Sequence, residues 1–155
     1  MVRLQVDTTA WSGVMIDSSG LILTAGRHLM SSPLSTFTLP SGPTGLAWTF
    51  KRDDSLDLAL LQVIDPIPLY PSIGLNAGAI PQVNEDLLVM GYPSTKGGAL
   101  DRVQARVVGI RQDFNTGIFY AQLDLSQKAG AAGSAVVDSQ ATLRGLWVHQ
   151  DQTIA

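Results

Sequence analysis

Hydrophobic and polar positions alternate with a period of two along most of the chain. Turn residues separate the short runs roughly every 8–12 positions, which is typical of antiparallel sandwiches and barrels. The alternation predicts strands at 4–6, 12–17, 21–24, 36–39, 45–51, 58–63, 86–90, 103–110, 117–123, 135–138 and 143–149. One short helical turn is expected near 25–30. The pattern therefore predicts an all-β chain.

One stretch, from 65 to 82, breaks this alternation. It contains four prolines, Pro66, Pro68, Pro71 and Pro81, and proline cannot donate a hydrogen bond to a strand ladder. We interpret 65–82 as a connector between an N-terminal half (1–64) and a C-terminal half (83–155) of a single domain, 1–155. Two halves of about six short antiparallel strands each fit two small six-stranded β-barrels, because closure removes exposed sheet edges.

Composition narrows the possible chemistry. The chain has 155 residues, of which 45% are hydrophobic and 15% charged, as in globular proteins. Its net charge is −3 and its basic residues are scattered, so nucleic acid is not an expected partner. The absence of cysteine excludes disulfides, thiolate metal sites and a cysteine nucleophile. With two histidines and no carboxylate cluster, no metal site is expected.

Membrane association is not expected either. No apolar run approaches the ~18–20 residues of a membrane helix, and 1–6 lacks the apolar stretch of a signal peptide. The sequence indicates no particular compartment.

Four segments carry more specific information. They are 12–25 (SGVMIDSSGLILTA), 57–63 (DLALLQV), 89–93 (VMGYP) and 130–137 (GAAGSAVV), the last followed by LRGL at 143–146. In this order they resemble the G-S-G-V-x-I-D hairpin, the D-L-A-L-L strand, the G-x-P turn and the serine loop of trypsin-like serine proteases. The likeness is to the short bacterial HtrA/Deg form, and it spans nearly the whole chain. The resemblance implies that no cofactor is needed, because the chemistry of this family uses none.

The resemblance implies the sites of a Ser–His–Asp triad, in which histidine takes the serine proton and aspartate stabilises the imidazolium. Asp57 matches the aspartate, and Ala132 stands at the nucleophile position. An ungapped alignment places Arg27 at the histidine position, whereas a one-residue insertion near Gly26 would place His28 there. The ungapped spacings, 30 residues from 27 to 57 and 75 from 57 to 132, favour Arg27.

These substitutions predict that the chain is catalytically inactive. Alanine has no nucleophilic atom, and arginine stays protonated and cannot serve as a general base. A cation at position 27 would instead pair with the Asp57 carboxylate. His28 is interpreted as a surface histidine rather than a displaced base. Ser134, beside the nucleophile position, is not expected to attack, and Ser12 is interpreted as an ordinary strand residue.

The resemblance also implies two sites that could outlast the chemistry. An oxyanion hole would be formed by the backbone N–H groups of Gly130 and Ala132. A peptide would bind as an added strand along Leu146 and Trp147. Trp147 is equally compatible with lining this groove and with packing in the core.

We therefore predict a pseudoprotease domain that acts as a scaffold or binds a peptide or protein segment, and that can be one module of a larger chain. The alternative is an active serine endopeptidase represented by a Ser-to-Ala variant at position 132. Ala131, which stands where the family has Asp or Asn, favours natural loss, because one engineered change would not alter two neighbouring positions. A purely structural domain with a blocked groove is a third reading, and an unrelated all-β topology a fourth.

Overall fold

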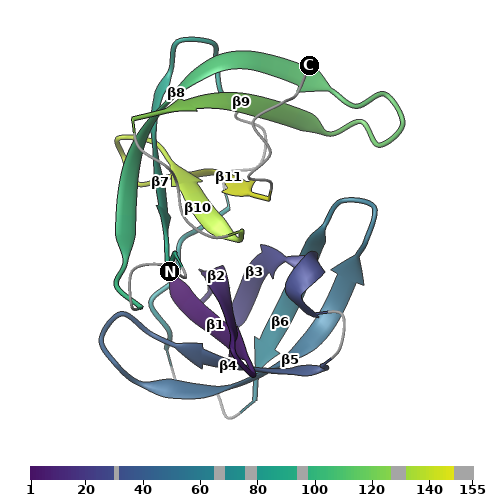
Figure 1. Cartoon of the computed structure of the whole chain (residues 1–155), viewed down its shortest axis with the longest axis vertical. Helices are drawn as coiled ribbons and strands as arrows, with labels where there is room; N and C mark the ends of the chain where they lie inside the picture. Colours follow the sequence, from purple (N-terminus) through teal and green to yellow (C-terminus); the bar gives the residue numbers. More distant parts are fainter. Residues whose placement is uncertain (30–31, 65–68, 76–79, 94–97, 127–131, 149–155) are drawn as a thin grey trace.

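The computed structural model describes residues 1–29, 32–64, 69–75, 80–93, 98–126 and 132–148, which form two β-sheet halves (Figure 1). The first half is a closed antiparallel barrel with the strand order β1-β2-β3-β6-β5-β4. Its strands are β1 (Val2–Val6), β2 (Thr9–Asp17), β3 (Leu21–Ala25), β4 (Leu34–Thr38), β5 (Thr44–Asp53) and β6 (Leu58–Val63). A single turn of 3-10 helix, η1 (Gly26–Leu29), follows β3 where a helical turn was expected.

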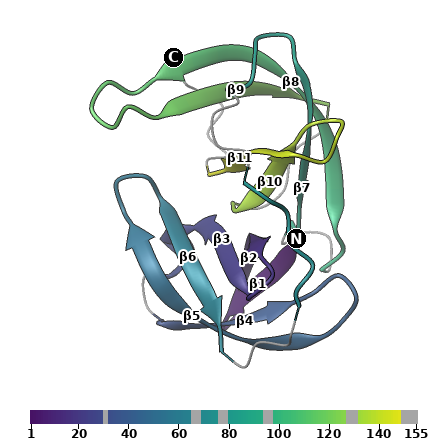
Figure 2. The same ribbon diagram turned by 180° about the vertical axis from the view of Figure 1, so that it is seen from behind.

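The second half is a curled antiparallel sheet with the order β11-β10-β7-β8-β9 (Figure 2). Its strands are β7 (Asp86–Gly91), β8 (Asp101–Gln112), β9 (Phe119–Leu125), β10 (Ser134–Val137) and β11 (Leu143–Trp147). The predicted all-β, two-barrel architecture is confirmed. The described residues of this half form five strands rather than six, because the half contains only five runs with period-two alternation.

The turn between β2 and β3 shows how local sequence closes a hairpin. Gly20 adopts a left-handed φ of 94°, which glycine reaches without the steric cost of a side chain. Its N–H donates to the carbonyl of Asp17 at 3.1 Å, and the Asp17 carboxylate accepts the N–H of Ser19 at 2.7 Å. The hairpin that the resemblance of 12–25 implies is therefore present.

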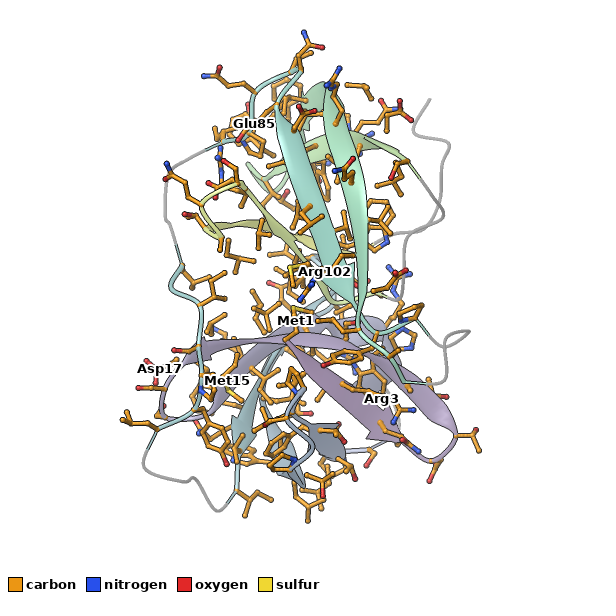
Figure 3. The ribbon with its side chains drawn as sticks, turned by 90° about the vertical axis from the view of Figure 1, so that its left-hand side faces the viewer. Met1, Arg3, Met15, Asp17, Glu85 and Arg102 are labelled. Carbon is orange, nitrogen blue, oxygen red and sulfur yellow. The ribbon has the colours of Figure 1, made fainter. Side chains whose placement is uncertain are left out.

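Three apolar clusters hold the molecule together. The barrel encloses Val2, Leu4, Trp11, Met15, Ile22, Leu29, Phe37, Leu39, Ala47, Ala59, Leu61, Val63 and Tyr70. The second sheet covers Leu87, Val89, Ala105, Val107 and Val136. The third cluster, formed by Val14, Ala135, Val137 and Leu143, joins the two halves. Met1 packs against this third cluster, and Figure 3 shows it where the halves meet.

The third cluster places β10 and β11 against the barrel. Both strands lie on the side of the second sheet that faces β2 and β3 (Figures 1 and 2). The candidate site is built at this junction. No helix among the described residues is long and apolar enough to cross a membrane.

Candidate functional site

Asp57 and Arg27 come together because their strands pair. Asp57 directly precedes β6, Arg27 lies two residues after β3, and Ala25 pairs with Leu58 across the two strands. The Asp57 backbone adopts a left-handed φ of 53°, and its carbonyl accepts the N–H of Gly26 at 2.9 Å. This local geometry turns the Asp57 side chain toward η1.

Both oxygens of the Asp57 carboxylate accept hydrogen bonds from Arg27. Its Oδ1 accepts the Arg27 backbone N–H at 2.7 Å, and its Oδ2 accepts both Nε, at 2.7 Å, and Nη2 of the guanidinium. The side chain of Asp57 is 18% exposed and that of Arg27 is 37% exposed. The cation expected opposite Asp57 is therefore present, and charge-assisted bonds of this kind are stronger than neutral ones.

Arg27 also reaches the second half. Its Nη2 donates to the backbone carbonyl of Val148, the residue that follows β11. The guanidinium thus connects a carboxylate of the first barrel to the end of the last strand of the second sheet.

His28 lies apart from the Asp57 carboxylate. Its imidazole stacks on the indole of Trp11, with ring centroids 5.2 Å apart and an interplanar angle of 28°. Burial lowers the pKa of His28, and the nearby Arg27 charge lowers it further, while Asp57 opposes them. No hydrogen bond joins His28 to Asp57, although the structure describes both residues. The lowered pKa favours the neutral form of the imidazole that stacks on Trp11.

The nucleophile position, Ala132, is buried in a turn between the two halves. Its carbonyl accepts the N–H of Ser12 from β2 at 3.1 Å. The next residue, Gly133, has a φ of 83° and donates its N–H to the carbonyl of Trp147 at 2.7 Å. A Cβ at Gly133 would overlap the carbonyl oxygen of Ser12. Backbone hydrogen bonds and close packing therefore fix this turn between β2 and β11.

A pair of buried serines strengthens the same junction, and sequence reasoning missed its role. Ser12 and Ser134 are both fully buried, and their hydroxyls lie 3.4 Å apart. The Ser12 hydroxyl also accepts the backbone N–H of Tyr92 at 2.7 Å, and a Cβ at Gly91 would overlap the Ser134 hydroxyl. The available signal in the sequence was a serine inside the run Trp11–Met15, in which apolar and polar residues do not alternate.

The expected oxyanion pair is described only in part, because Gly130 and Ala131 lie outside the described residues. The two groove residues, Leu146 and Trp147, point to opposite faces of β11. Trp147 packs against the core of the second sheet. Its indole N–H is buried and has no hydrogen-bond partner among the described residues. Leu146 packs against the cluster between the halves. Both side chains are only partly buried, and their role in a groove stays a prediction.

The backbone of β11 presents an open edge. β11 is the last strand in the sheet order, and in the part of the chain that is described its outer side meets only an isolated bridge from Leu75 to Leu143. The Trp147 carbonyl points toward β10, where it accepts the Gly133 N–H. Successive residues of a strand direct their backbone groups to opposite sides. The backbone groups of Leu146 and Val148 therefore point away from β10.

The described residues contain no group of three or more histidine, aspartate or glutamate side chains that could hold a metal ion. The site is instead a polar junction between the halves. It consists of the ion pair of Asp57 with Arg27, the buried turn at Ala132 and the open edge of β11.

Comparison with known proteins identifies the fold. A family model described as a trypsin-like peptidase domain matches residues 11–146. The chain belongs to the trypsin-like peptidase family. The serine endoprotease DegS of Escherichia coli, from strain K12 and from O157:H7, is 29% identical over 146 residues, which cover 89% of this chain and 39% of DegS.

A solved structure agrees with this assignment. The crystal structure of the serine endoprotease from Yersinia pestis is similar with a TM-score of 0.78 and 25% identity, over 94% of this chain and 52% of that one. The HtrA/Deg-like resemblance is confirmed. The chain spans about half or less of the length of these relatives.

Proposed function

We propose that this chain is a trypsin-like, HtrA/Deg-like domain that does not catalyse acyl transfer and instead binds an extended peptide segment at the edge of β11. One observation carries the proposal: the guanidinium of Arg27 donates two hydrogen bonds to the carboxylate of Asp57. In a serine protease that carboxylate would orient the imidazole that takes the serine proton.

The site lacks the side chains that a serine protease uses as general base and nucleophile. Arg27 uses both oxygens of Asp57, so the carboxylate has no free oxygen facing η1 for an imidazole. Arginine cannot accept a proton at ordinary pH, and His28 stacks on Trp11 instead. Ala132 supplies no oxygen to form an acyl-enzyme. Neither the base nor the nucleophile of the reaction is present at its expected position.

Backbone hydrogen bonds preserve the shape of the site beside β11. The turn at Ala132 and Gly133 is held by main-chain hydrogen bonds to Ser12 and Trp147, so it does not depend on catalytic side chains. The outward backbone groups beside it can pair with an extended peptide, and main-chain bonds give such complexes their affinity. The relatives named above are serine endoproteases, which act on polypeptides, and this supports a polypeptide ligand.

The loss of chemistry is tested with a fluorophosphonate probe and fluorescein-labelled β-casein. The parent should neither react with the probe nor cleave casein, because oxyanion and binding effects alone give only roughly 10³–10⁴-fold over water. Ala132→Ser alone should stay inactive, and Ala132→Ser with Arg27→His should react. Activity in the single variant that is abolished by His28→Asn would contradict the proposal and identify an inactivated endopeptidase.

Binding is tested by fluorescence anisotropy with the same labelled casein. The parent should bind, and Leu146→Pro should bind much more weakly, because proline removes an outward N–H without touching the Trp147 contact to Gly133. The melting temperature of each variant shows whether the fold is kept. If the parent does not bind, or a folded Leu146→Pro variant binds as the parent does, the edge of β11 is not the binding site.

A further inference from the structure

The contact between Arg27 and Val148 blocks part of the edge on which the proposed function rests. The Val148 carbonyl points outward from β11, on the side where a peptide strand would add. One of the two lone pairs of this carbonyl already accepts a hydrogen bond from the Arg27 guanidinium. We infer that Arg27 is an intramolecular competitor that holds the strand-binding edge closed and must release Val148 before a peptide pairs fully with β11.

The polarity of the contact explains the competition. A peptide strand added to β11 would donate a backbone N–H to each outward carbonyl and accept from each outward N–H. At Val148 the guanidinium already supplies that donor, and it brings a positive charge with several N–H groups. An incoming peptide N–H would face another donor there. While Arg27 is in place, a peptide can therefore pair with the outward backbone groups of Leu146 but not with those of both Leu146 and Val148.

Asp57 holds the competitor in place. The carboxylate binds the guanidinium through Nε and Nη2, while Nη2 also reaches the Val148 carbonyl. The side chain of Arg27 is 37% exposed, so release moves the guanidinium toward solvent and does not require the barrel to open. We call this arrangement the latch: Arg27 is held by Asp57 of the first barrel and binds the Val148 carbonyl of the second half.

The latch is tested by comparing the affinities of Arg27→Ala and the parent for fluorescein-labelled β-casein, measured by anisotropy at about 150 mM salt. Removing the competitor should tighten binding roughly tenfold, which corresponds to about 1.4 kcal/mol. A partly exposed charged contact justifies no larger effect. Arg106→Ala is the matched control, because it also removes an arginine paired with an aspartate, Asp86, and lies away from the edge.

Two further variants sharpen the test. Arg27→Lys keeps a cation beside Asp57 but has a single ammonium group in place of the guanidinium fork, so it should tighten binding by a smaller factor, about threefold. It also serves as the test if Arg27→Ala leaves Asp57 unpaired and fails to fold. Leu146→Pro added to Arg27→Ala should abolish the gain, because the gain depends on the same strand edge.

The outcomes separate the latch from the proposed function. Tighter binding by Arg27→Ala with no change in Arg106→Ala supports the latch. Binding by Arg27→Ala alone supports the latch and contradicts peptide binding by the parent. Equal affinities overturn the latch and leave the proposed function standing. Weaker binding by Arg27→Ala overturns the latch and makes Arg27 part of the ligand site. Binding by neither protein overturns both.

Discussion

The two halves of the molecule solve the same packing problem in different ways. The first closes its six strands into a barrel around thirteen buried apolar residues, including the whole side chain of Trp11. The second curls five described strands over a core cluster of five buried residues and completes it with partly buried side chains such as Trp147. The closed half has no strand edge, whereas the described residues of the curled half leave the edge of β11 open.

This difference separates two tasks. A closed barrel buries its backbone hydrogen-bonding groups in its own ladder and cannot accept another strand. An open sheet can, but it needs support from outside. In this chain the barrel supplies that support, through Ser12 on one side of β10 and β11 and through Arg27 on the other. The substitutions that follow test how firmly the halves are joined and how differently they are packed.

The largest effect is expected where the halves touch. Gly133→Ala places a Cβ on the carbonyl of Ser12, at a backbone φ of 83°, so the clash and the strain should together lower the free energy of unfolding by at least about 4 kcal/mol. Gly117→Ala, in the β8–β9 turn at a φ of 72° with open space around it, should cost only about 1 kcal/mol. Urea denaturation measures both, and equal losses would show that the junction is loose.

The two cores are compared through matched leucines. Leu61→Ala in the barrel should lower the free energy of unfolding by about 3–4 kcal/mol, because the hydrogen-bonded wall around this fully buried residue cannot collapse into the cavity. Leu87→Ala in the curled sheet should cost about 2 kcal/mol, because a sheet with an open edge relaxes more easily. If chemical denaturation shows the order reversed, the curled sheet is the more rigid half.

A smaller effect is expected for the buried serine hydroxyls. Ser12→Ala leaves the N–H of Tyr92 without its acceptor and should cost about 1–3 kcal/mol. Ser35 is equally buried, but its hydroxyl has no partner, so Ser35→Ala should be neutral or slightly stabilising. Thermal unfolding of both variants measures their losses of stability. A larger loss in Ser12→Ala than in Ser35→Ala shows that the hydrogen bond between the halves stabilises the fold, and not the burial of a hydroxyl alone.

The smallest effect is a shallow pH dependence from the barrel side of the site. The pKa of His28 is lowered in the folded state below its ordinary value of 6.5. The folded protein therefore binds a proton less readily than the unfolded chain, so its stability is full above about pH 6.5 and falls as the pH drops through the folded pKa. His28→Asn should flatten this part of a stability curve recorded between pH 5 and 8. An unchanged slope would assign the titration to another group.

Much of the fold could be predicted from the sequence because strands and turns are local. Every predicted strand overlaps an observed one, and Leu58–Val63 agrees at both ends. The Arg27–Asp57 pair was also predictable, since the ungapped spacing of the family motifs places a cation opposite the acid. The oxyanion pair and the groove stay predictions, because Gly130 lies outside the described residues and no ligand tests Leu146 and Trp147.

The contacts that could not be predicted are those across the halves. The bond from Arg27 to Val148 joins residues 121 positions apart, and no local pattern encodes such a pairing. Ser12 was interpreted as an ordinary strand residue, because a serine in a strand normally faces solvent. Its burial follows from the third cluster, which forms only when both halves are in place. The stacking of His28 on Trp11 has the same origin, since it depends on how η1 folds back over β2.

The way the turn at Gly133 is anchored bears on how such domains can be found. All three polar groups of Ser12 are used: its N–H by Ala132, its carbonyl by the Thr24 hydroxyl and its own hydroxyl by Tyr92. Ala132 stands at the nucleophile position, but it contributes only its backbone carbonyl, and Thr24 and Tyr92 lie outside the triad. None of these bonds therefore uses a catalytic side chain, so catalytic side chains can be replaced while the surrounding shape is kept. A search built on the triad would pass over a chain like this one. A search built on the buried serines and close-packed glycines of the junction would detect it.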